Sequence, residues 1–183
     1  MSKKSKKKKP IIPKFWTGLQ PALILAGLAF LLYANTLGHD FVLDDDIITR
    51  KNSLVQKGFA GIPEIFTHGY LYGFNGMNDQ SYRPLVLVNL AIETALFGQK
   101  SSVHHFFNVL LYALSCFFLL AFARRLLGKE GMYWAFGACL LFTAHPIHTE
   151  VVANIKSRDE ILSFLFVILS LDQLIRYAEG REN

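Results

Sequence analysis

An uncharged apolar run near the N-terminus most limits the folds open to this chain. Residues 16–37 contain no charged side chain. At 1.5 Å per residue, a helix of this length crosses the hydrocarbon core of a bilayer. The whole chain of 183 residues is 52% hydrophobic and holds 16 phenylalanines, which is unusual for a soluble domain. The sequence therefore predicts an all-α integral membrane protein.

A lysine-rich tail precedes this run: Lys3, Lys4, Lys6, Lys7, Lys8, Lys9 and Lys14. Lysines next to a transmembrane segment typically hold the N-terminus in the cytoplasm and contact anionic lipid. We therefore read residues 1–14 as a cytoplasmic tail and expect no nucleic-acid partner. The apolar run is longer than the core of a cleaved signal peptide and has no small-x-small cleavage site at its end, so it is predicted to be an uncleaved signal-anchor.

Four further apolar segments follow, at about 84–97, 105–127, 131–145 and 160–177. The first of these is only about 21 Å long as a helix and contains Asn89 and Glu93, so it is expected to lie at the interface, with Glu93 facing water or the outer loop. Arg124, Arg125 and Arg176 then return to the cytoplasmic side, as the positive-inside rule requires. The prediction is about four transmembrane helices, one interfacial helix and a cytoplasmic tail at 179–183.

This topology gathers the ionisable side chains on the extracytoplasmic face. Residues 38–83 form the one long loop there, and all six histidines lie in the outer segments or at the adjoining helix ends: His39, His68, His104, His105, His145 and His148. The function is therefore expected outside the cytoplasm.

Three carboxylates, Asp44, Asp45 and Asp46, lie directly after the first apolar run. Charges at such a depth are costly and are retained for a purpose. Adjacent carboxylates repel each other, so one of the first two is expected to have a raised pKa and to act as a general base, with Asp45 preferred. The alternative is that Asp44 or Asp45 caps a short helix beginning at Ile47.

Other polar residues suggest anion binding. Arg83, His105 and Arg158 are candidates for holding phosphate, arginine through its planar fork; the alternatives are a lipid-headgroup anchor and a helix start. His145, His148 and Glu150 are alternatively ligands of a divalent metal, although the His-Glu-x-x-His signature is missing. Cys116 and Cys139 fall inside apolar runs and are predicted to be packing residues.

Five motifs occur in an order that resembles a known family: Tyr33 to Asp45, Ser81-Tyr-Arg83-Pro84-Leu85, His105-Phe-Phe-Asn108, Ala144-His145-Pro146-Ile-His148-Thr-Glu150, and Ser157-Arg158-Asp-Glu160. They are similar to the N-terminal portion of the transmembrane and tetratricopeptide-repeat O-mannosyltransferases. These proteins are membrane glycosyltransferases of the C type (GT-C). The resemblance runs from about residue 33 to residue 166.

The resemblance implies transfer of a hexose, such as mannose, from a polyprenyl-phosphate donor to a hydroxyl group on the extracytoplasmic face. It makes Asp45 and Asp44 the predicted catalytic residues. The predicted substrate- or phosphate-binding residues are Arg83, His105, Arg158, Glu160, His145, His148 and Glu150. No cofactor is implied with certainty, and a divalent metal is left open.

Family members have more transmembrane helices, so the chain is expected to be a truncated GT-C-like core in residues 15–178, completed by a partner chain. A non-catalytic membrane binding or assembly module is the alternative, and a small metal- or ion-handling membrane protein is a weaker third. The compact lysine-rich start favours a bacterial inner membrane.

Overall fold

The computed structural model describes residues 13–77 and 80–181, so most of the lysine-rich tail lies outside the described residues. Within the described ranges every regular element is a helix. The prediction of an all-α protein is therefore confirmed.

The first apolar run forms two helices and not one. α1 (Lys14–Thr17) ends at Gly18, α2 (Gln20–Tyr33) follows, and the 3-10 helix η1 (Ala34–Gly38) continues it. Pro21 lies in the first turn of α2, a position where its missing N–H group costs nothing. The ring of Trp16 in α1 packs edge-on against Tyr133, with the ring centroids 4.8 Å apart.

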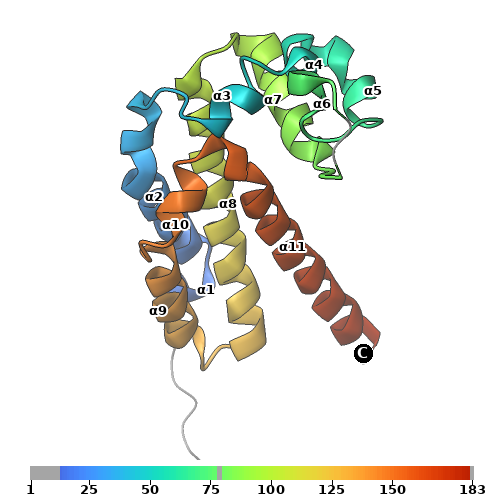
Figure 1. The fold of residues 1–183 in the computed structure, drawn as a ribbon. Coiled ribbons are helices and arrows are strands. Elements are labelled where there is room, and N and C mark those ends of the chain that lie inside the picture. Colours follow the sequence, from blue (N-terminus) through green and yellow to red (C-terminus); the bar gives the residue numbers. More distant parts are fainter. Residues whose placement is uncertain (1–12, 78–79, 182–183) are drawn as a thin grey trace, which may run out of the picture.

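The long helix α8 (Ser101–Leu127) is the centre of the bundle. It packs against α2, against α9 (Met132–Thr143) and against α11 (Arg158–Arg181). Figure 1 shows α2, α8 and α9 side by side, while α11 leans away from them toward its C-terminal end. Small buried residues such as Ala29, Ala113 and Ala135 let these helices approach closely, as is common between helices in membranes.

A cap of short helices covers one end of the bundle (Figure 1). It consists of α3 (Asp44–Ile48), α4 (Ser53–Gln56), η2 (Gly58–Gly61), α5 (Ile62–Ile65), α6 (Tyr72–Asn75) and α7 (Pro84–Phe97). A second hydrophobic cluster includes Leu54, Ile65 and Leu90 of the cap and extends to Ile155 and Leu162. Two short elements, α10 (His148–Val152) and η3 (Ile155–Ser157), lead from α9 into α11 and bring that chain segment beside α3.

Three helical stretches are long and apolar enough to cross a membrane among the described residues: Gln20–Gly38, Ser101–Leu127 and Ile155–Gly180. At about 1.5 Å per residue, α9 is only about 18 Å long, shorter than the roughly 30 Å of hydrocarbon. The helix over 84–97 has the predicted bounds. Its interfacial position and the fourth crossing at 131–145 stay predictions.

In Figure 1, α1, the turn between α8 and α9, and the C-terminal end of α11 lie at one end of the bundle, opposite the cap. If the cap is outside the cytoplasm, Asn75→Cys in the exposed part of the cap will react with a membrane-impermeant thiol reagent in intact cells. Lys129→Cys at the opposite end will react only after permeabilisation. Lys129 is preferred to its neighbour Gly128, whose φ of 64° strains any larger residue. Labelling of Lys129→Cys in sealed cells would overturn the topology.

Candidate functional site

Asp44, Asp45 and Asp46 form the first turn of helix α3, and none of them is its N-cap residue. The N-cap position is Leu43, which turns the chain with a φ of 44°, and no side chain makes a capping hydrogen bond there. The alternative reading of Asp44 or Asp45 as a cap for a helix beginning at Ile47 is therefore wrong.

Asp45 is the buried member of the cluster, with 1% of its surface exposed. One carboxylate oxygen, Oδ1, accepts a hydrogen bond from the backbone N–H of Lys156 at 2.9 Å. Burial raises the pKa of this carboxyl above its usual value of 3.8, and hydrogen bonds from backbone groups oppose that rise only in part. A raised pKa was expected from repulsion between adjacent acids, but its main cause is the loss of solvent.

The other two acids are paired on the surface. Asp44 Oδ2 lies 2.5 Å from Lys156 Nζ, and Asp46 pairs with both Arg50 and Lys51. Asp44 and Asp45 border a hollow of about 370 Å³, which we call the acidic cleft. Its lining residues are Val42, Leu43, Asp44, Asp45, Thr149, Glu150, Ala153, Asn154 and Lys156.

A second hollow of about 420 Å³, the central cavity, lies on the other side of the Asp44–Lys156 ion pair. It is lined by Asp44, Ile47, Ile48, Tyr70, Leu71, Phe74, Ser81, Arg83, Lys156, Ser157, Asp159 and Glu160. Arg83 Nη1 pairs with Asp159 Oδ2 at 2.8 Å. The same guanidinium lies 5.4 Å from the centre of the Tyr70 ring, within the range of a cation–π contact.

Arg83 and Asp159 also border a third hollow of about 290 Å³, which we call the α7–α11 groove. Its other lining residues are Tyr82, Pro84, Leu85, Val86, Leu162, Ser163 and Phe166, which are mostly apolar. The acidic cleft, the central cavity and the groove are thus contiguous, because each shares lining residues with the next.

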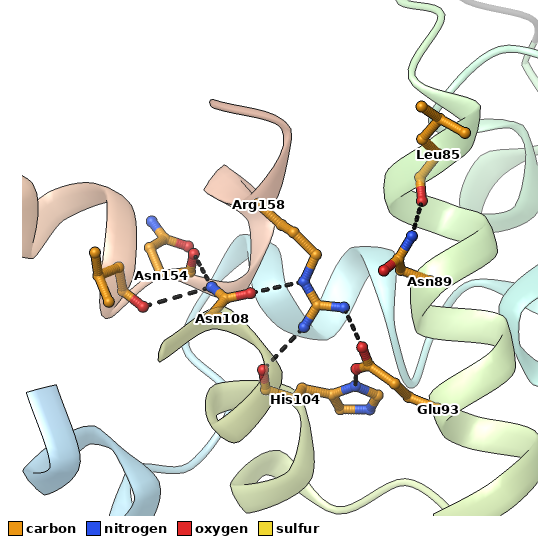
Figure 2. A network of polar contacts seen from close by, with 8 residues as sticks. Leu85, Asn89, Glu93, His104, Asn108, Asn154 and Arg158 are labelled. Carbon is orange, nitrogen blue, oxygen red and sulfur yellow. Dashed lines mark hydrogen bonds and ion pairs between the residues drawn. The ribbon is translucent and has the colours of Figure 1, made fainter. Parts of the chain in front are cut away.

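Arg158 is fully buried, lines none of these hollows and donates to groups of the protein (Figure 2). Its Nε donates to Asn108 Oδ1 at 2.7 Å, its Nη1 to Glu93 Oε1 at 2.5 Å, and its Nη2 to the carbonyl oxygen of His104 at 2.8 Å. Asn108 also donates to the carbonyl oxygens of Val152 and Asn154. The network therefore ties α7, α8 and the start of α11 together.

The expectation that Glu93 faces water or the loop is wrong. Its side chain is 4% exposed, and its second oxygen, Oε2, lies 2.6 Å from Nδ1 of His104. The spacing of apolar residues along α7 did not reveal this, because an ion-paired carboxylate is buried without being apolar. Asn89, one turn earlier, instead donates to the carbonyl oxygen of Leu85 (Figure 2).

Of the remaining predicted site residues, the two glutamates line the hollows and the three histidines do not. Glu150 lines the acidic cleft, and Glu160 lines the central cavity. His148 packs on Phe142, with ring centroids 4.3 Å apart, and burial lowers its pKa. His145 Nδ1 accepts from the N–H of Ile147. His105 is buried and lines none of the three hollows.

No group of three or more His, Cys, Asp or Glu side chains is arranged to hold a metal ion in residues 13–77 and 80–181. Residues 145–150, the alternative metal site, place His145 and His148 with ring centroids 6.2 Å apart. The described residues therefore give this alternative no geometric support.

Sequence reasoning missed Lys156, Tyr70 and Asp159 as residues of the hollows. Nothing in the pattern around Lys156 separates it from a solvated surface charge, and nothing around Tyr70 separates it from the other aromatic residues of the long loop. A detectable signal did exist for Glu93, His104 and Asn108, since polar residues inside apolar helices are usually paired with one another.

The fold and these hollows define an all-α integral membrane protein with charged cavities at one end of its helical bundle. No family model matches the sequence, and no solved structure matches it. A mouse protein named protein O-mannosyl-transferase TMTC2 is 36% identical over 161 residues, which is 87% of this chain and 19% of that protein. Human protein O-mannosyl-transferase TMTC1 is 34% identical, over 84% of this chain and 18% of that protein.

A Caenorhabditis elegans protein O-mannosyl-transferase, F38B6.6, is 30% identical over 90% of this chain and 24% of its own length. The chain spans about a fifth of the length of the curated relatives it matches. It belongs to this family of O-mannosyl-transferases as the counterpart of part of those proteins.

Proposed function

We propose that the chain takes part in transferring a hexose, mannose by analogy with the names of its relatives, from a polyprenyl-phosphate donor to a hydroxyl acceptor. The observation that carries the proposal is the position of Asp45. Its buried carboxylate borders the acidic cleft, and the Asp44–Lys156 ion pair alone is common to that cleft and the central cavity.

The reaction assigned to this site is a single displacement at the anomeric carbon of the sugar. Asp45 accepts the proton of the acceptor hydroxyl as its oxygen bonds to that carbon, and the bond from the carbon to the phosphate oxygen breaks. The lipid phosphate leaves with the bonding electrons. General-base help of this kind typically contributes about 10²–10⁴-fold in rate. Asp44 acts by holding Lys156 at 2.5 Å between the two hollows.

The leaving phosphate is assigned to Arg83, which borders both the central cavity and the α7–α11 groove. A guanidinium forms two parallel hydrogen bonds to phosphate oxygens, which suits a developing negative charge. The apolar residues of the groove, including Leu85, Leu162 and Phe166, suit the lipid chain. Arg158 is not assigned to phosphate, because its donors already have protein partners.

The proposal places the hollows on the extracytoplasmic face, as the positive-inside asymmetry predicts. It also includes further helices around the groove, from a partner chain or from the same protein, since the curated relatives are about five times as long as the matched part. The rest of the described structure covers little of α11, since only 22% of its apolar stretch is buried.

The pH dependence of sugar transfer tests the role of Asp45. A base works only when ionised, so the rate should fall as the pH drops through the pKa of Asp45, which lies above 3.8. Asp46→Asn is the matched control. Hydrogen bonds and ion pairs with Lys51 and Arg50 lower the pKa of Asp46, so removing this carboxylate should leave the fall in rate at low pH unchanged. A wild-type rate that stays constant down to the ordinary titration range of aspartate would contradict the assignment.

A further inference from the structure

Two buried polar atoms at the central cavity have no hydrogen-bond partner among the described residues. They are the hydroxyl of Tyr70 and Oδ1 of Asp159. Tyr70 is 8% exposed, and it lines the cavity together with Asp159. An unpaired buried polar group is costly and uncommon in native structures. We therefore expect a ligand in the cavity to form hydrogen bonds with both atoms.

The charges around the cavity indicate what kind of partner fits. Its cations, Arg83 and Lys156, are already paired with Asp159 and Asp44, and Glu160 adds a further carboxylate. With three acids against two cations, the interior does not attract an anion by its net charge. A neutral polyol suits it better, because hydroxyl groups both donate and accept hydrogen bonds.

The walls and the size agree with a sugar. A volume of about 420 Å³ lies within the roughly 300–1,000 Å³ of small-molecule sites. Besides the charged groups, the lining includes the apolar residues Ile47, Ile48, Leu71 and Phe74. A hexose has polar edges and an apolar face of C–H groups, which matches a cavity of this composition.

We propose that the central cavity holds the hexose of the lipid-linked donor, with the Tyr70 hydroxyl and Asp159 Oδ1 as hydrogen-bonding partners of its hydroxyl groups. The proposal rests on the function proposed above and names the residues that recognise the sugar. The phosphate then lies at the rim, where Arg83 belongs to both cavity and groove. Arg83 has a side chain 48% exposed and pairs with Asp159, so its movement toward the phosphate releases Asp159.

The electrostatic surroundings support the placement of Tyr70. Burial raises the pKa of its hydroxyl well above the usual value of 10.0, and the carboxylates of Asp159, Asp45 and Asp44 raise it further, while Arg83 lowers it. Tyr70 therefore keeps its proton at physiological pH and is available as a neutral donor near the three acids.

Binding of two lipid probes to the purified full chain in lipid nanodiscs tests this inference: polyprenyl phosphate with mannose attached, and polyprenyl phosphate alone. We expect Tyr70→Phe, which keeps the ring, to weaken binding of the mannosylated lipid about tenfold and to leave binding of the bare lipid unchanged. Tyr72→Phe is the matched control, because Tyr72 lines none of the three hollows and its ring keeps the stacking contact with His68. Asp159→Asn should also weaken binding of the mannosylated lipid more than that of the bare lipid.

An equal loss for both probes in Tyr70→Phe, or no loss for either, would overturn the inference. The inference also falls if the wild-type chain does not distinguish the two probes. Wild-type protein that binds the mannosylated lipid more tightly through Tyr70, yet transfers no sugar in any assay, would refute the proposed function and leave the sugar site standing.

Discussion

Asp45→Asn is expected to lower the rate of sugar transfer by about 10²–10⁴-fold, the usual cost of losing a general base. The amide keeps the shape of the side chain, and its oxygen still accepts the hydrogen bond from the N–H of Lys156. The substitution also removes a charge whose burial is unfavourable. The variant should therefore insert and accumulate like the wild type, and a measured unfolding temperature no lower than that of the wild type will show that the loss is chemical.

Asp46→Asn again provides the control within the same turn of helix. Among the described residues, Asp46 forms ion pairs with Arg50 and Lys51, and it lines none of the three hollows. Exposed ion pairs contribute about 0–1 kcal/mol each, so both activity and stability should change little. Equal losses of activity in the Asp45 and Asp46 variants would mean that the cluster acts through the structure of the cap.

Arg158→Met is expected to destabilise the fold by about 3–5 kcal/mol, because it leaves a buried carboxylate without its partner. Glu93 has a side chain 4% exposed and pairs with Arg158 at 2.5 Å. Asn108 and the carbonyl group of His104 would also lose a donor. Thermal unfolding in detergent should show a large drop in midpoint, with little folded protein recovered from membranes.

The double variant Arg158→Met with Glu93→Leu should recover much of that loss, since replacing both partners of a buried pair by apolar residues is often neutral. Arg125→Met is the matched control: Arg125 also forms ion pairs, with Asp172 and Glu179, but its side chain is 26% exposed. If Arg158→Met folds as well as Arg125→Met and loses only sugar transfer, Arg158 holds phosphate as the sequence suggested, and the network is not structural.

Much of the fold was predictable, because the lengths of the apolar segments and the proline and glycine residues at their ends determine the helices locally. The helix over 84–97 was found at its observed bounds, since Pro84 opens it and Gly98 ends it. The break between α1 and α2 was not found, because a window of uncharged residues does not show where a helix is interrupted. Gly18 and Pro21 were the available signal.

The site was predictable only where a residue type implies one role. Asp45 was singled out as an acid emerging from the membrane, and the structure makes it the buried acid of its cluster. Arg158 was read as a phosphate ligand because charge alone does not tell whether a guanidinium meets a ligand or a carboxylate 65 residues away. Tyr70 and Lys156 enter the hollows through tertiary contacts, which no local pattern encodes.

Mass spectrometry of an acceptor peptide measures sugar transfer by the chain itself. The peptide, rich in serine and threonine, is incubated with mannosylated polyprenyl phosphate and with membranes of cells that express the chain from its own locus. We expect a hexose on a peptide hydroxyl with wild-type membranes and with Asp46→Asn membranes, and a loss of at least about 10²-fold with Asp45→Asn membranes. Full modification of the peptide by Asp45→Asn membranes, with the variant shown to be the only copy present, would contradict this expectation.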